Sequence, residues 1–386
     1  MCVTEMLFSL LRAQLQGVAV EEKTVACIHT DTLEPLYQLS KAHDLAHIVG
    51  VALSKTGKLG KDEISVKFKQ ASYVAMCRYE QKKLELQRLC KTLETAGIPF
   101  IPLKGAVVGT FYPEPWMRTS CDIDVLIHEE DIDSAVAVLA QTLEYKQDMK
   151  TTHDISLFSP GNIHIELHYR LVEDNRAKLA TTVLNDVWDS AKPRQDNSCW
   201  YELSDEMLYF YHIAHMAKHF ENGGCGVRPF LDLWILDSIQ TAQQEKREAL
   251  LLQGGLLHFA ENVRLLGAVW LGKEKHNALT QEMERFILDG GIYGNMEKKT
   301  VIEQQKRGGK VQYFLSKTVL PYEQMKETYP VLQKHRWLLP AMQVRRWFRI
   351  LIHGIAPQTK KELAVSQKAS RSEVENVGRF LKDIGL

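Results

Sequence analysis

The segment at residues 122–127, which reads Asp-Ile-Asp-Val-Leu-Ile, constrains the fold of this chain more than any other. Residues two apart on a β-strand point to the same side, so Asp122 and Asp124 are expected to project together while the aliphatic residues pack inwards. Two neighbouring carboxylates repel each other, which raises a pKa or requires a cation between them. Oxygen ligands of this kind suit Mg²⁺. The alternative interpretation is a strand end with two solvated aspartates.

Composition predicts an ordinary globular protein. The 386 residues are 45% hydrophobic and 25% charged, which indicates two or three domains with a sizeable core. The predicted parts are an N-terminal helical region at 1–90, an α/β core at 91–192 and a C-terminal helical domain at 193–386. Lys+Arg and Asp+Glu are equal in number, which argues against stable binding of long nucleic acid.

The seven cysteines are odd in number, widely scattered and without metal-finger spacing, so reduced thiols and a cytoplasmic location are predicted. The N-terminus lacks the basic region and apolar run of a signal peptide. We expect no transmembrane segment, because no apolar run is long enough to cross a bilayer. Residues 337–355 are basic and apolar together, which is typical either of a helix on a membrane surface or, as we favour, of one packed into the helical domain.

A strand-to-helix turn is predicted just before the aspartates. Residues 33–53 and 64–96 predict helices, and an apolar run at 98–103 with two prolines predicts an edge strand. Lys104 and Gly105 follow directly. A helix N-terminus leaves free backbone N–H groups that bind anions, and the lysine adds a positive charge. The alternative is a turn without a ligand.

A hairpin is predicted at 155–158 and 163–167, with a type II turn at the Pro-Gly of 159–162. Glu166 then lies on a polar strand face together with a histidine on either side of it. That face is expected to meet the aspartate pair across the sheet. The alternative is a polar outer face without a function.

Beyond residue 198 the chain is predicted to be helical almost to its end. Three histidines come at helical spacing, and His215 and His219 share a face. Asp232 lies on the next predicted helix.

The combination of motifs resembles a known family. The motifs are Leu103-Lys104-Gly105, Arg118, Asp122-Ile123-Asp124 and Ile165-Glu166-Leu167-His168. In this order they resemble the uncharacterised nucleotidyltransferase family of the DNA polymerase β-like superfold, and the likeness runs through most of the chain. The resemblance implies an α+β fold, with a small mixed β-sheet core flanked by N-terminal helices and a larger C-terminal helical domain.

The resemblance also implies roles for individual residues. Asp122 and Asp124 would hold two Mg²⁺ ions, with Mn²⁺ as an alternative, and Glu166 would be the third catalytic, metal-binding carboxylate. Gly105 would stand in the phosphate-binding turn. The wider superfamily has Gly-Ser or Gly-Gly at that turn, whereas this chain has Gly105 followed by Ala106, so it lacks the serine hydroxyl that would touch the triphosphate.

The leading hypothesis is metal-assisted transfer of a nucleoside monophosphate from a nucleoside triphosphate such as ATP to an acceptor hydroxyl. The acceptor is a small molecule, a protein or an RNA end. Lys104 is expected to bind the nucleotide, and Arg118 to neutralise phosphate or to brace the aspartate strand. Glu166 or His168 is expected to act as general base. An acceptor pocket is expected to contain His215, His219 and Asp232.

Two alternatives belong to other functional classes. The first is a catalytically silent nucleotide-binding or interaction module, which the alanine at position 106 favours. The second is a zinc hydrolase that uses His164, Glu166 and His168 with the histidines of the 212–219 helix, since zinc prefers nitrogen ligands of this kind.

Overall fold

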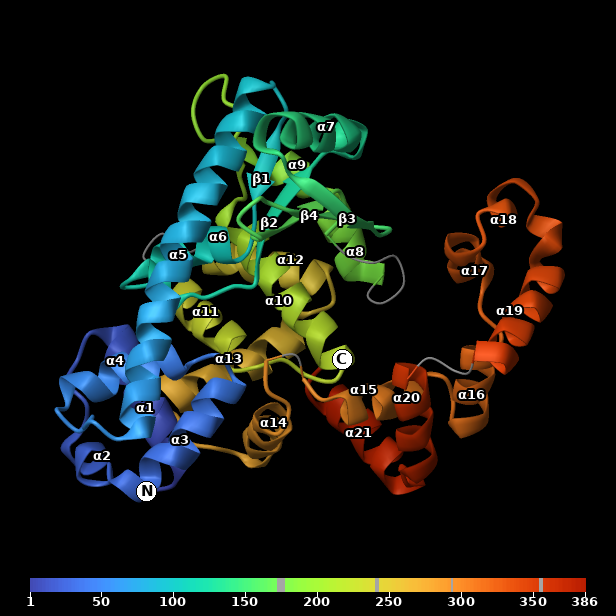
Figure 1. The fold of residues 1–386 in the computed structure, drawn as a ribbon. Coiled ribbons are helices and arrows are strands. Elements are labelled where there is room, and N and C mark those ends of the chain that lie inside the picture. Colours follow the sequence, from blue (N-terminus) through green and yellow to red (C-terminus); the bar gives the residue numbers. More distant parts are fainter. Residues whose placement is uncertain (172–177, 240–242, 293, 354–356) are drawn as a thin grey trace. The chain divides into compact units, whose positions relative to one another are not determined.

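The computed structural model describes residues 1–171, 178–239, 243–292, 294–353 and 357–386 (Figure 1). By compactness the chain divides into two units. The first comprises 1–218, 226–292 and Gly385, and the second comprises 219–225, 293–384 and Leu386. The three-part division of the sequence at residues 90 and 192 stays a prediction.

The first unit begins with five helices. They are α1 (Val3–Gln16), α2 (Glu22–Ala26), α3 (Thr30–Ala42), α4 (Ala46–Lys55) and α5 (Glu63–Thr95). The predicted helix over 64–96 corresponds to α5, which starts where the Asp62 side chain accepts a hydrogen bond from the backbone of Ser65. The single helix predicted over 33–53 is wrong. Asp44 has φ +56°, a left-handed conformation that a right-handed helix cannot contain, so the segment divides into α3 and α4.

This unit contains a five-stranded mixed sheet. Its strands are β1 (Phe100–Pro102), β2 (Asp122–Ile127), β3 (Lys146–Lys150), β4 (Asp154–Phe158) and β5 (His164–His168). The spatial order is β1-β2-β5-β4-β3, in which β2 and β5 run parallel and the other neighbours run antiparallel. The predicted α+β class with a small mixed sheet is confirmed.

One face of the sheet is buried under α5 and α7 (Ile132–Leu143), as Figure 1 shows. The strands contribute Ile123, Val125, Ile127, Ile155, Leu157, Ile165 and Leu167 to this core, and the helices contribute Leu89, Cys90, Leu93, Ile132, Ala135, Leu139 and Leu143. These strand residues alternate with the polar residues of β2 and β5. The acids and histidines therefore point to the opposite face, as the period of two requires.

The hairpin between β4 and β5 forms where it was predicted, but its turn is different. Asn162 N–H bonds to the Ser159 carbonyl at 2.8 Å, and Asn162 has φ +58°. A type II turn would require the positive φ at Gly161, which does not have one. The type II prediction is wrong because the asparagine takes the left-handed position that was assigned to the glycine.

The remaining elements of the first unit are short strands and helices. They are α6 (Gly105–Val108), α8 (Lys178–Asn185), α9 (Val187–Ser190), β6 (Lys192–Pro193), β7 (Tyr201–Glu202), α10 (Asp205–Glu221), which runs into the second unit, α11 (Arg228–Asp237), α12 (Gln244–Gln253), α13 (Leu257–Leu271) and α14 (Ala278–Leu288). All seven cysteines lie in described residues and none of them forms a disulfide.

The second unit is helical. Its elements are α15 (Met296–Lys306), α16 (Lys310–Thr318), α17 (Tyr322–Thr328), α18 (Val331–Lys334), a 3₁₀ turn η4 (Arg336–Leu338), α19 (Leu339–His353), α20 (Pro357–Lys368) and α21 (Arg371–Asp383). Across the part of the chain that the structure describes, no helix combines the length and apolar character needed to span a membrane.

Candidate active site

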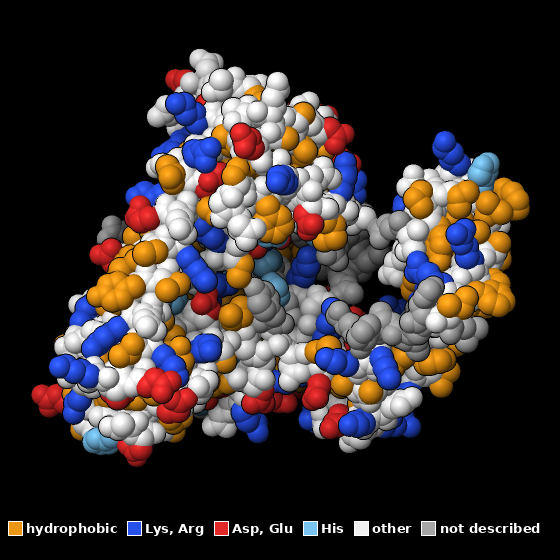
Figure 2. Space-filling model, in the orientation of Figure 1, with side chains coloured by type: hydrophobic (Ala, Val, Ile, Leu, Met, Phe, Trp, Pro, Cys, Tyr) orange, Lys and Arg blue, Asp and Glu red, His pale blue; other side chains and the backbone are white. Residues whose placement is uncertain are grey.

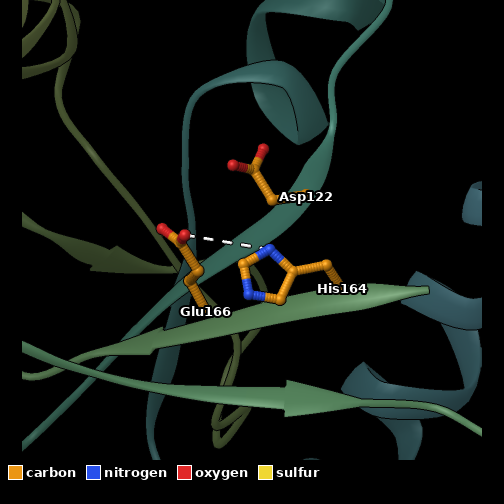
Figure 3. A group of neighbouring side chains, drawn as sticks. All are labelled: Asp122, His164 and Glu166. Atoms are coloured by element: carbon orange, nitrogen blue, oxygen red, sulfur yellow. Dashed lines mark ion pairs between the residues drawn. The ribbon is translucent and has the colours of Figure 1, made fainter. Parts of the chain in front are cut away.

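Acidic and imidazole side chains gather on the polar face of β2 and β5. The parallel register sets Asp122 beside His164 and Asp124 beside Glu166, so side chains two apart on each strand share this face. Figure 3 shows Asp122 on one strand and His164 and Glu166 on the next, with His164 Nδ1 3.9 Å from Glu166 Oε1. The structure thus places Glu166 with both aspartates.

Two overlapping sets of side chains lie close enough together to hold a metal ion. The first is Asp122, His164 and Glu166, and the second is Asp124, Glu166 and His168. Within each set one potential ligand atom per residue lies within 4.8 Å of the others. Both sets contain Glu166, whose two carboxylate oxygens can serve neighbouring cations.

Asp124 is the most buried of the three acids on β2 and β5, with 3% of its surface exposed. Its Oδ1 accepts a hydrogen bond from Lys104 Nζ at 2.6 Å and another from His168 Nε2 at 2.9 Å. Burial by itself raises the pKa of Asp124, but Lys104 and His168 outweigh it and hold the pKa well below its usual range. Asp124 is therefore ionised, and its charge is balanced within the fold.

The pKa of Asp122 is shifted in the opposite direction, above its usual value. Burial raises the pKa of this carboxyl, and repulsion from Asp124 raises it further, against the weaker attraction of Lys104. Two carboxylates on one face with pKa values pushed apart are typical of a functional site. A cation bound between them would remove the repulsion, so the donor set fits a divalent ion.

His168 contacts both acids of the second set. Its Nε2 lies 2.9 Å from Asp124 Oδ1 and 3.3 Å from Glu166 Oε2. A carboxylate only accepts hydrogen bonds, so Nε2 carries a proton and donates it. Burial lowers the pKa of His168, but the hydrogen bonds to Asp124 and Glu166 raise it above the usual value. In this arrangement His168 orients the two acids.

The Lys-Gly turn lies next to the aspartates. Lys104 has φ +46° and precedes α6, which starts at Gly105. A Cβ added at Gly105 would lie 3.3 Å from both Arg118 Nη1 and Ser120 Cβ, closer than most side-chain contacts. Glycine therefore permits the close approach of this turn to the segment that leads into β2.

Arg118 faces away from solvent and pairs with Asp232 of α11. Its Nε lies 2.8 Å and 2.9 Å from the two carboxylate oxygens, and Tyr112 donates a hydrogen bond to the same acid at 2.6 Å. Nη1 of Arg118 also donates to the Thr119 carbonyl at 2.6 Å. These contacts tie the entry of β2 to α11. They support the bracing role of Arg118, and its role as a phosphate ligand stays a prediction.

The sequence matches one protein-family model. The family model described as "Uncharacterised nucleotidyltransferase" matches residues 30–272, more than half of the chain. The chain belongs to this nucleotidyltransferase family. Neither the curated proteins nor the solved structures that were compared contain a match.

The family match spans the acids of β2 and β5 as well as Lys104 and Asp232. Membership supports a general activity, the transfer of nucleoside monophosphates. The second unit of the chain lies mostly outside the matched residues.

The predicted acceptor histidines lie on α10. The ring of His215 is 6.2 Å from that of Tyr211, and His219 belongs to the second compact unit. Nε2 of His212, which the hydrolase alternative used, lies 2.8 Å from the Pro229 carbonyl oxygen. The acceptor roles of His215, His219 and Asp232 stay predictions.

Two residues beside the site were not selected from the sequence. Lys82 of α5 donates hydrogen bonds to Ser120 Oγ at 3.1 Å and to the Asp122 carbonyl at 3.4 Å, and burial lowers the pKa of this lysine. Tyr211 of α10 is buried, which raises its pKa, and the nearby Asp124 and Glu166 carboxylates raise it further. A lysine in a long amphipathic helix and a tyrosine in an apolar run carry no sequence signal that distinguishes them from surface and core residues.

Proposed function

We propose that this nucleotidyltransferase moves a nucleoside monophosphate from a triphosphate to an acceptor hydroxyl, and that divalent cations held by Asp122, Asp124 and Glu166 are required. The observation that carries the proposal is the register of β2 and β5, which brings each aspartate together with Glu166 and one histidine, with ligand atoms within 4.8 Å in each set. Such paired sites suit an in-line displacement at phosphorus. The bond that forms joins the acceptor oxygen to the α-phosphorus, and pyrophosphate leaves.

The donor set favours Mg²⁺, with Mn²⁺ as the alternative. Carboxylate oxygens are hard ligands that suit both ions, while the imidazole of His164 in the first set suits Mn²⁺ better than Mg²⁺. When bound, the cations would neutralise triphosphate charge and increase the acidity of the attacking hydroxyl. His168 already donates Nε2–H to Asp124, so we assign it to orienting the acids.

Three side chains around the cation site are assigned different roles. Lys104 keeps Asp124 ionised and places a positive charge where phosphate oxygens would arrive. Glu166 belongs to both ligand sets, so we assign it to holding the cations beside each aspartate. Arg118, through Asp232, holds the start of β2 in place.

One observation favours a silent nucleotide-binding module as the second candidate. Ala106 replaces the serine whose hydroxyl would touch the triphosphate, and the ammonium of Lys104 lies where a cation would meet Asp124. A silent module would bind nucleotide in the presence of Mg²⁺ but release no pyrophosphate.

Labelled substrates test the proposal. The protein is incubated with Mg²⁺, a cell extract and each of ATP, GTP, CTP and UTP labelled at the α-phosphate, and the molecule that gains the label is identified. We expect transfer with at least one nucleotide, ATP being the first to test, and loss of transfer in the double variant Asp122→Ala with Asp124→Ala. Binding without pyrophosphate release supports the silent module. Transfer at the wild-type rate by the double variant refutes the metal assignment.

A further inference from the structure

A surface of the second unit exposes large apolar side chains in water. On α19, Val344, Phe348 and Ile352 recur every four residues and form one stripe, and 61% of Phe348 and 74% of Ile352 are exposed. Trp337, in the 3₁₀ turn just before the helix, is 77% exposed. Figure 2 shows hydrophobic and basic side chains gathered over α17–α19. Clustered exposed apolar side chains of this size mark an interaction site.

The stripe is not needed to hold α19 in place. The opposite side of the helix packs on a small core, through Leu339 and Met342 against Met325, Tyr329 and Leu332. The helix is also tied to the end of α16. Arg346 Nη1 and Trp347 Nε1 each donate to the Thr318 carbonyl at 2.8 Å. Because the inner side already anchors the helix, the outer stripe is available to a partner.

Positive charge flanks the stripe. The guanidinium groups of Arg345 and Arg349 lie 5.9 Å and 5.8 Å from the centre of the Tyr329 ring. Among the described residues, no carboxylate lies within 4.0 Å of either group. The sequence of α19 contains three arginines and no Asp or Glu, although the chain as a whole is neutral. The surface is therefore complementary to an anionic partner that also accepts apolar side chains.

We propose that this surface, formed by α19 and Trp337, binds the anionic face of a lipid bilayer. At a bilayer interface apolar side chains enter the acyl boundary, tryptophan sits at the headgroups and arginines meet lipid phosphates. A nucleic acid would satisfy the arginines and could stack on Trp337 and Phe348, but it would leave the aliphatic side chains of Val344 and Ile352 exposed to water, whereas the acyl boundary of a bilayer would bury them. A second copy of this chain would bring like charges together. The inference is independent of the proposed catalytic function.

Vesicle sedimentation with the full chain tests the proposal. Vesicles of phosphatidylcholine are compared with vesicles that also contain phosphatidylserine. We expect binding to the anionic vesicles, weakened by added salt, and little binding to the neutral ones. Two double variants, Phe348→Ser with Ile352→Ser and Arg345→Gln with Arg349→Gln, are each expected to lower the apparent affinity by about tenfold or more.

Matched controls separate the site from general effects. Lys361→Gln with Lys368→Gln removes two exposed charges from α20, and Tyr73→Ser with Leu84→Ser removes two exposed apolar side chains from α5. These controls are expected to bind like the wild type, and thermal unfolding verifies that every variant folds.

Several results overturn the proposal. One is a wild-type protein that does not bind anionic vesicles, and another is a loss of binding in the controls equal to that in the α19 variants. A third is concentration-dependent self-association that Phe348→Ser abolishes, which assigns the surface to a second copy. RNA binding that Arg345→Gln abolishes while vesicle binding persists assigns it to nucleic acid.

Discussion

The ammonium of Lys104 lies 2.6 Å from Oδ1 of Asp124, inside the group of acids that would hold a cation. Lys104 and His168 together compensate the buried charge of Asp124, so this carboxylate is ionised before any ion arrives, whereas Asp122 is still repelled by it. A divalent cation that uses this oxygen has to compete with the ammonium. Substitutions can therefore measure how strongly Lys104 competes with a cation for Asp124.

Replacing Lys104 with methionine tests this balance. A buried carboxylate that loses its main partner destabilises the fold, and we expect the free energy of unfolding to fall by about 3 kcal/mol. We also expect Mg²⁺ to raise the melting temperature of Lys104→Met more than that of the wild type, because the competing ammonium is gone. Thermal unfolding with and without Mg²⁺ measures both effects. Lys150→Met, at an exposed ion pair, is the control, and an equal Mg²⁺ effect on wild type and Lys104→Met contradicts the account.

The pair of Arg118 and Asp232 predicts a dependence of stability on pH. Burial raises the pKa of Asp232, but Arg118 and the other donors outweigh it and leave the pKa below its ordinary value. A depressed pKa stabilises the fold above the unfolded-state pKa of about 3.9, and this stabilisation is lost as pH falls through the folded-state pKa.

We expect Asp232→Asn to lower the free energy of unfolding at neutral pH by about 3 kcal/mol and to flatten its decline below about pH 4. Urea unfolding across the acid range measures this. Asp133→Asn, at an exposed acid, should leave the curve unchanged. If the free energy of unfolding of Asp232→Asn fell with pH in parallel with that of the wild type, the stability would not depend on the titration of Asp232.

The alanine in the phosphate turn predicts a gain of affinity. If the turn holds the triphosphate, Ala106→Ser restores the missing hydroxyl. One additional hydrogen bond of about 1 kcal/mol should tighten nucleotide binding about fivefold. Equilibrium binding of ATP with Mg²⁺ measures the change. Val107→Thr introduces a hydroxyl at the next residue and serves as the control. Unchanged affinity in Ala106→Ser places the triphosphate elsewhere.

His164 should influence the choice of metal. Its imidazole belongs to one of the two sets of ligand atoms, and nitrogen ligands favour Mn²⁺ over Mg²⁺. We expect His164→Ala to weaken Mn²⁺ binding more than Mg²⁺ binding in calorimetric titrations. His335→Ala, an exposed histidine of the second unit, is the control. Equal losses for both ions would contradict the predicted preference for Mn²⁺, and unchanged binding of both ions would show that His164 is not a ligand.

The sheet and its polar face followed from local patterns. Alternation with a period of two separates Asp122 and Asp124 from Ile123 and Val125, and both the α+β class and the helix over 64–96 are confirmed. The left-handed residues Asp44 and Asn162 were missed, because glycine is the residue expected at a positive φ.

The surroundings of the acids were harder to foresee. The parallel register of β2 and β5, which sets Asp124 beside Glu166, joins segments that are far apart in sequence. Lys82 and Tyr211 reach the site from α5 and α10 through tertiary packing, and no local pattern indicates that approach. The residue types of the site were thus predictable, while the groups that adjust its electrostatics were not.

The most direct test of the central claim compares nucleotide transfer by the wild type and by Asp122→Asn, with both proteins shown to be folded. The variant keeps the shape of the side chain and leaves the pairing of Asp124 with Lys104 intact. We expect Mg²⁺-dependent release of pyrophosphate by the wild type and a loss of about a hundredfold or more in Asp122→Asn, since cation binding supplies several kcal/mol to this reaction. Release by Asp122→Asn at the wild-type rate would contradict the account.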